Sequence, residues 1–189
     1  GARFSVRNPA THEVIAEDAD LDEQDVREAI EAADRVFASW RSKTAKERAA
    51  LLRKWYELMM ASQEDLARLM TAEQGKPLAE SRGEIAYGAS FIEWFAEEGK
   101  RIYGDVIPTN AHGRRIIVVK EPIGVVAAVT PWNFPNAMIT RKVGPALAAG
   151  CPVVVKPAQL TPRSALALAE LAHRAGLPKG VCNVVPSTK

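Results

Sequence analysis

The sequence predicts an α/β protein in which a helical N-terminal segment leads into a parallel β-sheet that is incomplete in this chain. Between residues 22 and 104, apolar side chains recur at helical spacing. From Gly124 onward, short apolar runs alternate with helical stretches in a βαβαβ order. This order implies parallel strands joined by right-handed crossovers.

The composition is that of an ordinary globular protein with no polyelectrolyte partner. The 189 residues are 47% hydrophobic, and the net charge is +2 with basic and acidic residues interleaved. We therefore expect no nucleic-acid or membrane partner. No apolar run is long enough to span a bilayer, and the N-terminus has no signal-peptide pattern. With only two cysteines, far apart, we expect a cytoplasmic protein without disulfides or a metal site.

Two short β-strands joined by a turn open the chain, and four helices follow. The strands are Phe4–Val6 and Val14–Ala16, with the turn at Asn8–Ala10. The expected helix-start signals are, in chain order, Asp22, the Thr44–Glu47 capping box, Ser62 and Pro77 in a first turn. We assign the aromatic side chains at helical spacing to the core: Trp40, Trp55, Phe91, Trp94 and Phe95.

The pattern changes after Gly104. Residues 115–120 form a strand with charged ends, which by itself is an edge strand that needs a partner. The run 124–130 is continuously apolar, which predicts a parallel strand covered on both faces. It is followed by an expected helix, strand, helix and strand at about 138–149, 152–156, 162–175 and 181–185.

A rigid turn, Pro131–Pro135, follows the first of these parallel strands. The two prolines fix φ and restrict Thr130 and Phe134 to extended backbone. The amide of Asn133 is thereby held at the carboxyl end of a strand, which is where open α/β sheets bind ligands. We therefore expect a binding or catalytic site at this turn.

Several long strings of the sequence resemble the NAD(P)-dependent aldehyde dehydrogenase superfamily, over essentially the whole chain. They are NPATHEVI, TAEQGKPLAES, EPIGVVAAVTPWNFP, MITRKVGPALAAGCPVVVKPA and TPRSALALAELAHRAGLPKGVCNVVP. SFIEWFAEEGKRIYGD and AMITRKVGPALAAG are most similar to succinate-semialdehyde dehydrogenases. The resemblance implies three parts: a helical part of the cofactor-binding domain (1–104), a strand of an oligomerisation hairpin (105–122), and the first half of a Rossmann-like NAD(P)-binding sheet (123–189).

The resemblance also implies a reaction. In this family a cysteine thiolate attacks the aldehyde, hydride passes to the nicotinamide, and water hydrolyses the thioester. Asn133 corresponds to the asparagine that donates its side-chain N–H to the tetrahedral oxyanion, a role that suits a preorganised amide. The alternative is an asparagine that satisfies a buried loop carbonyl.

The resemblance implies that NADP or NAD is the cofactor. Thr130, Pro131, Trp132 and Asn133 would line the dinucleotide site, together with the segment Lys156-Pro157-Ala158-Gln159. Lys156 would reach the adenosine ribose, and the alternative for it is a solvated loop lysine. A glutamate at the position of Gln159 favours NAD, so the neutral Gln159 predicts that NADP is tolerated.

Arg141 resembles the arginine that binds the substrate carboxylate in succinate-semialdehyde dehydrogenases. A guanidinium can pair with a carboxylate bidentately. A surface arginine on an exposed helix turn is an equally good interpretation. Cys151 and Cys182 are expected to be small core residues, because neither lies in a segment that resembles the family's nucleophile.

Two functions are therefore open. The first is the N-terminal part of an aldehyde dehydrogenase that oxidises a semialdehyde, with succinate semialdehyde the leading substrate, in a homo-oligomer whose catalytic cysteine and glutamate lie beyond Lys189. The second is a catalytically inactive fragment that binds a dinucleotide or assembles with a partner chain.

Overall fold

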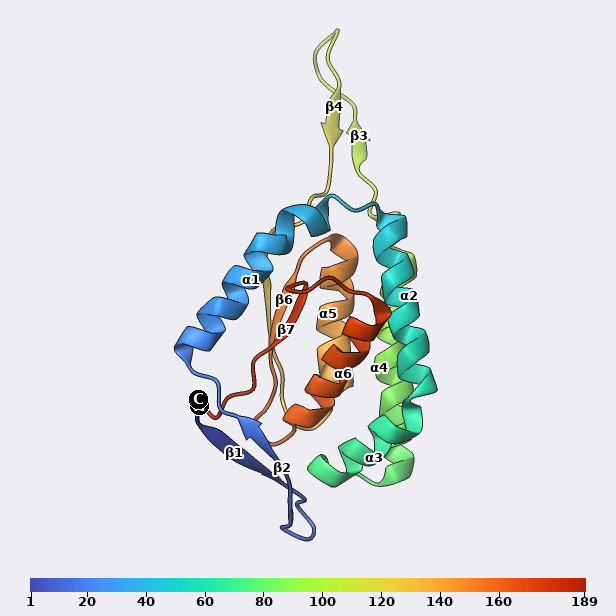
Figure 1. The fold of residues 1–189 in the computed structure, drawn as a ribbon. Helices are drawn as coiled ribbons and strands as arrows, with labels where there is room; N and C mark the ends of the chain where they lie inside the picture. Colours follow the sequence, from blue (N-terminus) through green and yellow to red (C-terminus); the bar gives the residue numbers. More distant parts are fainter.

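The computed structural model describes residues 1–189 and contains three small sheets and six α-helices (Figure 1). The strands are β1 Arg3–Arg7, β2 Val14–Ala19, β3 Asp105–Ile107, β4 Ile116–Val118, β5 Val126–Val129, β6 Val153–Lys156 and β7 Cys182–Val184. The helices are α1 Glu23–Arg41, α2 Ala45–Ala61, α3 Gln63–Gln74, α4 Leu78–Glu98, α5 Ala137–Ala149 and α6 Pro162–Ala175, with a 3₁₀ turn at Gly99–Arg101.

The central sheet has the predicted parallel βαβαβ topology. Its strand order is β5-β6-β7, and both pairs are parallel. Val126 lies opposite Val153, and Val153 lies opposite Cys182. The carboxyl ends of the three strands therefore meet at one edge, as the alternation of strands and helices predicts.

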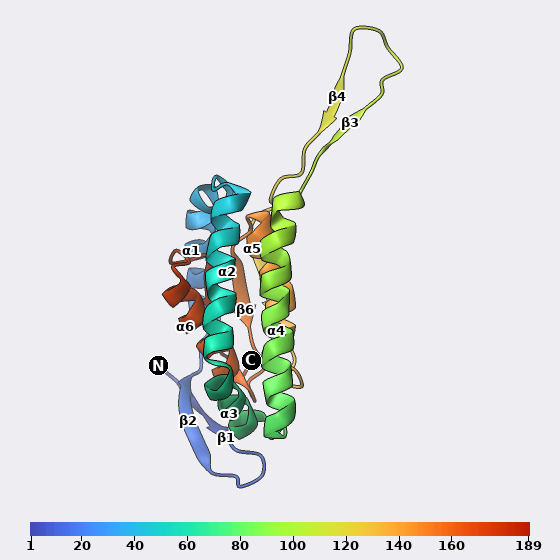
Figure 2. The same ribbon diagram turned by 90° about the vertical axis from the view of Figure 1, so that its right-hand side faces the viewer.

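The helices form layers around this sheet (Figures 1 and 2). Helix α1 lies against β6 and β7 on one face, and α5 and α6 cover the other face. Helices α2 and α4 form a further layer outside α5 and α6. Most buried apolar side chains belong to one core between these layers, in which Leu52, Ile92 and Leu147 are fully buried. The fold class is thus confirmed.

Two helices begin with the expected caps. Asp22 accepts hydrogen bonds from the backbone N–H groups of Gln24 and Asp25, and Thr44 forms a capping box with Glu47. The prediction for Ser62 is wrong, because its side chain makes no capping bond. Ser62 also ends α2, where its ψ of 15° departs from the extended backbone that an N-cap side chain needs.

Pro77 and Trp94 also differ from the predictions for α4. Pro77 precedes the helix in extended backbone, one position before the first turn. Trp94 is 63% exposed, whereas Trp40 and Trp55 are buried as expected and Phe91 and Phe95 are half-buried. The buried stripe of α4 instead runs along residues 85, 89, 92 and 96, and Trp94 lies on the opposite side of the helix.

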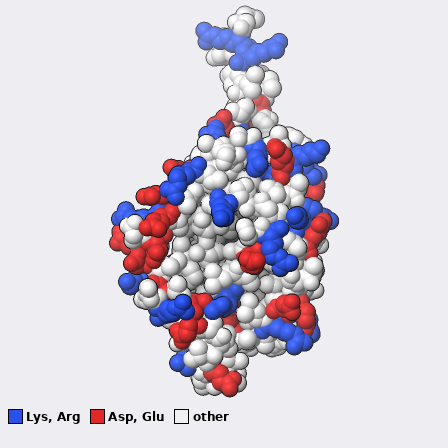
Figure 3. Space-filling view, in the orientation of Figure 1, with Lys and Arg blue, Asp and Glu red and all other residues white.

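The expectation that the first parallel strand is covered on both faces is wrong. Ala128 is buried beneath α5, but Ala127 and Val129 are exposed. The physical reason is the position of α1, which packs on β6 and β7 and leaves the same face of β5 open. Figure 3 shows a broad, mostly uncharged area between α1 and α6 that has a basic side chain within it and charges of both signs around it.

The strand expected at 115–120 has a partner within the chain. Strand β4 pairs antiparallel with β3, and this hairpin projects from the helical body (Figure 2). Its apolar side chains are exposed, Val106 to 76% and Ile117 to 67%. No helix has both the length and the apolar character that crossing a membrane requires.

Candidate functional site

The turn Pro131–Pro135 leaves β5 at the carboxyl edge of the sheet, next to the end of β6. The backbone N–H of Thr130 donates to the carbonyl of Lys156 at 3.1 Å, which joins the two strand ends. Asn133, Trp132 and Phe134 are exposed to solvent. The turn therefore presents its side chains outward, and its position depends on bonds made by its backbone.

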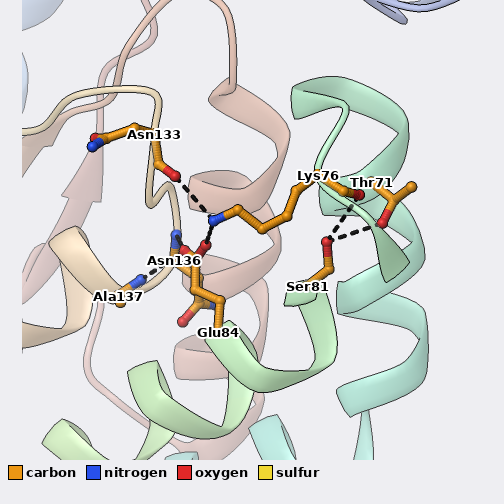
Figure 4. Close-up of polar contacts among 7 residues, drawn as sticks. All are labelled: Thr71, Lys76, Ser81, Glu84, Asn133, Asn136 and Ala137. Carbon is orange, nitrogen blue, oxygen red and sulfur yellow. Dashed lines mark hydrogen bonds and ion pairs between the residues drawn. The ribbon is translucent and has the colours of Figure 1, made fainter. Parts of the chain in front are cut away.

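A buried ion pair from the helical layer holds this turn (Figure 4). The Lys76 ammonium lies 2.5 Å from a Glu84 carboxylate oxygen, with side-chain exposures of 10% and 1%. The same ammonium donates to the backbone carbonyl of Asn133 at 3.0 Å and lies 4.0 Å from the centre of the Phe134 ring. Lys76 thus contacts two consecutive residues of the turn.

The other oxygen of Glu84 caps α5. It accepts hydrogen bonds from the backbone N–H groups of Asn136 at 2.9 Å and Ala137 at 3.2 Å. Helix α5 has no side-chain cap of its own. A carboxylate at this point satisfies two free donors and complements the positive end of the helix dipole. The close approach requires Gly88, since a Cβ there would lie 2.0 Å from Oδ1 of Asn136.

These contacts leave the side chain of Asn133 free. Its bond to the rest of the chain is made by the backbone carbonyl, while Figure 4 shows the side-chain amide pointing away from Lys76 and Glu84. The alternative role, in which this amide satisfies a buried loop carbonyl, is not the arrangement seen. The amide can donate to a bound molecule at the carboxyl edge of the sheet.

Arg141 lies near the same turn. Its guanidinium donates to the hydroxyl of Tyr87 at 2.6 Å and lies 4.9 Å from the centre of the Phe91 ring. Tyr87 and Asn133 line one shallow pocket of about 360 Å³ between α4 and the turn. Arg141 is half-buried and lies against two aromatic rings, of which Tyr87 is itself exposed.

The residues predicted to bind a dinucleotide fall into two places. Lys156 lines a largely apolar groove of about 610 Å³ between α1 and the sheet, where its ammonium donates to the carbonyl of Ser187 at 3.2 Å. Trp132 and Gln159 instead line a second pocket of about 350 Å³ beside the turn of the β1–β2 hairpin. Thr130 and Pro157 are buried. Pro131 is exposed and Ala158 is half-buried, and neither lines the groove or the second pocket.

A second glutamate at this edge was not predicted. Glu73 of α3 accepts hydrogen bonds from the backbone N–H groups of Arg163 at 2.9 Å and Ser164 at 2.8 Å, at the start of α6. Burial raises the pKa of Glu73 to about 7, against the lowering effect of these bonds and with a further contribution from Asp18. The Arg163 guanidinium pairs with Asp18 at 2.8 Å.

The contacts of Lys76, Glu84 and Glu73 could not be seen in the sequence. Their bonds to the backbone join residues more than fifty positions apart, although Lys76 and Glu84 lie only eight positions from each other. No local signal pointed to these contacts, because Asn136 and Thr161 at the starts of α5 and α6 are residue types that can cap a helix, and only the structure shows that neither does.

Cys151 is a core residue, as expected, whereas Cys182 is half-buried and packs against the core. Cys151 is buried, and burial raises the pKa of Cys182 to about 12. No group of three or more His, Cys, Asp or Glu side chains has a geometry that could hold a metal ion.

Comparison with known proteins places this chain among aldehyde dehydrogenases. The model of the aldehyde dehydrogenase family matches residues 1–189. A glutarate-semialdehyde dehydrogenase of Pseudomonas putida KT2440 is 66% identical over 185 residues, which is 98% of this chain and 38% of that protein. The NADP⁺ succinate-semialdehyde dehydrogenase of Escherichia coli K12 is 64% identical over the same shares.

Solved structures give the same result. The crystal structure of an E. coli NADP-dependent enzyme, 63% identical, superposes with a TM-score of 0.99 over 100% of this chain and 39% of that one. The chain thus spans well under half the length of the relatives it matches, and it corresponds to their N-terminal portion. With a family match over its full length and these identities, the chain belongs to the aldehyde dehydrogenase family.

Proposed function

We propose that the protein containing this chain oxidises a semialdehyde to the carboxylate with NADP or NAD, and that Asn133 donates to the oxyanion. The observation that carries this proposal is the placement of Asn133. Its backbone is fixed by Lys76 at the carboxyl end of β5, while its side-chain amide is free. A donor held in place before the reaction stabilises developing charge without reorganising.

In the proposed reaction, this chain positions the aldehyde and stabilises the charge that forms on its oxygen. Attack by a thiolate converts the carbonyl oxygen into an oxyanion, and the Asn133 side-chain N–H donates to it. In the family that this chain resembles, the thiolate and the general base come from a part of the protein that follows the segment matched here. Neither Cys151 nor Cys182 can replace the thiolate, because Cys151 is buried and burial of the Cys182 thiol raises its pKa to about 12.

The groove at the carboxyl edge of the sheet fits a dinucleotide. Its lining is mostly apolar and also includes Asp22, Glu23, Lys156, Ser187 and Lys189. The Lys156 ammonium can bond ribose hydroxyls, and NAD(P) when bound there supplies the hydride acceptor. Gln159 carries no charge that would repel a 2′-phosphate. We therefore propose that NADP is accepted, in agreement with the NADP specificity named for the E. coli relative.

Arg141 supports a substrate that carries an anionic group in addition to its aldehyde. Tyr87 and Phe91 hold its guanidinium beside the pocket that Asn133 lines. A guanidinium is suited to bidentate pairing with a carboxylate. Both relatives named above act on semialdehydes, of succinate and of glutarate, which carry a carboxylate distal to the aldehyde.

The variant Asn133→Ala tests the oxyanion role in the full-length protein. We expect kcat for NADP-linked oxidation of succinate semialdehyde to fall by roughly a hundredfold or more. Asn110→Ala, at an exposed asparagine in the hairpin loop, is the matched control and should leave kcat unchanged. An unaltered kcat in Asn133→Ala would remove this amide from the mechanism.

The variant Arg141→Met tests the substrate class. For succinate and glutarate semialdehydes we expect KM to rise about tenfold or more, because a charge-assisted bidentate pair is lost. Butanal, which has the chain length of succinate semialdehyde but no carboxylate, serves as the control substrate and should keep its KM. An equal change for both aldehydes would assign Arg141 a structural role only.

We also propose a cytoplasmic homo-oligomer. The β3–β4 hairpin supports the oligomer, because it projects from the body with exposed apolar side chains. Light scattering on the full-length protein should give a multiple of the chain mass, and Ile117→Lys on the hairpin should lower it. The alternative function, an inactive assembly module, predicts instead that no semialdehyde is oxidised by protein of verified intact mass.

A further inference from the structure

Resting on the proposed function, we propose that Lys76 and Glu84 are positioning residues for the oxyanion donor. Both residues line the pocket beside Asn133, but their ammonium and carboxylate groups are engaged with each other and with backbone groups. Each acts on the backbone that carries Asn133.

The contacts of the pair fall on Asn133 itself and on residues that follow it in sequence. Lys76 bonds the carbonyl of Asn133 at 3.0 Å and lies over the Phe134 ring. Glu84 bonds the N–H groups of Asn136 and Ala137 at 2.9 and 3.2 Å. The ion pair at 2.5 Å joins these two anchor points, so the turn and the first turn of α5 are held to α4 as one unit (Figure 4).

The turn has two other anchors, the Phe134 carbonyl, which accepts from the Met138 N–H of α5 at 3.0 Å, and the buried Pro135, but neither is a bond to α4. Trp132, Asn133 and Phe134 are exposed, and none of them is held by burial in the core. The prolines restrict φ within the turn, but they do not fix its position relative to α4. A displacement of about 1 Å in a catalytic group can cost about a hundredfold in rate.

Stability alone is a weak reason for such a pair. Desolvating two charges is costly, and replacing a buried ion pair with neutral side chains of similar size is often neutral for stability. A helix N-terminus can also be capped without any lysine. The feature that the lysine adds is its bond to the Asn133 carbonyl, and the pair is therefore best explained by the position of that residue.

The test uses the full-length protein with the double substitution Lys76→Met and Glu84→Gln. Methionine replaces the apolar stem of the lysine, and glutamine keeps an oxygen that accepts from the start of α5, so no buried charge is left unpaired. We expect kcat to fall about tenfold, with KM for the semialdehyde and Kd for NADP within about twofold of the parent, as for an interaction made in the transition state.

A double-mutant cycle with Asn133→Ala decides whether the pair acts through Asn133. In the Asn133→Ala background, the double substitution should cause little further loss of kcat, because the group it positions is already absent. A loss of kcat that multiplies fully with that of Asn133→Ala, or an unchanged kcat in the double variant, would overturn the proposal.

Two further measurements separate this proposal from the proposed function. Replacing the exposed pair Arg53–Glu93, which joins α2 to α4 at 2.7 Å, with Met and Gln is the matched control and should leave kcat unchanged. Amide hydrogen exchange of the peptide covering residues 132–138 should be faster in the Lys76 and Glu84 variant, whether or not the protein oxidises a semialdehyde. Unchanged exchange would refute the positioning role even in an active enzyme.

Discussion

Helices α5 and α6 follow consecutive strands of one sheet, and the first backbone N–H groups of each are capped by a glutamate of another helix. Glu84 of α4 bonds the first N–H groups of α5, and Glu73 of α3 bonds those of α6. Neither helix has a side-chain cap of its own. The two helix starts therefore solve the same problem of unpaired backbone donors in the same way.

They differ in what neutralises the buried carboxylate. Glu84 is paired with the ammonium of Lys76, which also bonds the turn that carries Asn133. Glu73 has no such cation, because the guanidinium of Arg163 pairs with Asp18 instead. Burial accordingly raises the pKa of Glu73 to about 7. The Lys76 charge at the start of α5 thus also holds the turn that carries Asn133. At the start of α6 no such cation pairs with Glu73, and its carboxyl group has a pKa near neutrality.

Removing the two glutamates one at a time should have the largest effect on the free energy of unfolding, and the loss should differ between the starts of α5 and α6. Glu84→Ala leaves the Lys76 charge buried without a partner, and we expect it to lower the free energy of unfolding by about 3–5 kcal/mol. Glu73→Ala removes a cap but also a poorly solvated carboxylate, so about 1–2 kcal/mol is expected at neutral pH. Chemical denaturation of the full-length protein measures both. Equal losses would mean that the counter-charge at α5 is unimportant.

The pH dependence of stability sharpens the comparison further. The folded-state pKa of Glu73 is about 7 against an ordinary value of 4.5, so the folded protein keeps a proton that the unfolded chain has already released. This contribution is fully present below pH 4.5, is lost as pH rises to about 7, and amounts to about 3 kcal/mol. The partially exposed Arg163 and the nearby Asp18 are the charged groups that face it.

The variant Glu73→Gln should remove that pH dependence. Glutamine keeps an oxygen for the N–H groups of α6 but cannot titrate, so its stability relative to the parent should rise between pH 5 and pH 8. Denaturant titrations of parent and variant at both pH values give the difference. A constant difference between the two proteins would show that Glu73 does not titrate in this range.

Helices that carry their own caps should show the smallest effects. Thr44→Ala removes a capping-box bond and should cost about 1 kcal/mol, as should Asp22→Ala. Ser62→Ala should cost close to nothing, because the Ser62 side chain makes no capping bond. Thermal melts of the three variants test this order, and a Ser62→Ala loss as large as that of Thr44→Ala would contradict it.

Most of the fold could be predicted because its signals are local. The capping residues of α1 and α2, the glycine after α6 and the apolar runs of β5, β6 and β7 lie within a few residues of the elements they specify. The turn that carries Asn133 could also be placed, since its prolines and the preceding strand are contiguous. The errors concern Ser62, Pro77, Trp94 and the coverage of β5, and for Trp94 and β5 the outcome depends on which neighbour packs against the residue.

The sequence by itself determined the order of elements, the parallel sheet and the position of Asn133 at its carboxyl edge, because periodicity, prolines and caps act over short distances. Only the tertiary structure decided how that edge is held. Lys76, Glu84 and Glu73 look like ordinary charged helix or loop residues in the sequence. Lys76 and Glu84 are eight positions apart, but the backbone groups that the three residues bond lie 52 to 91 positions away. Burying a charge is favourable only when folding brings its partners to it, and that meeting has no local signature.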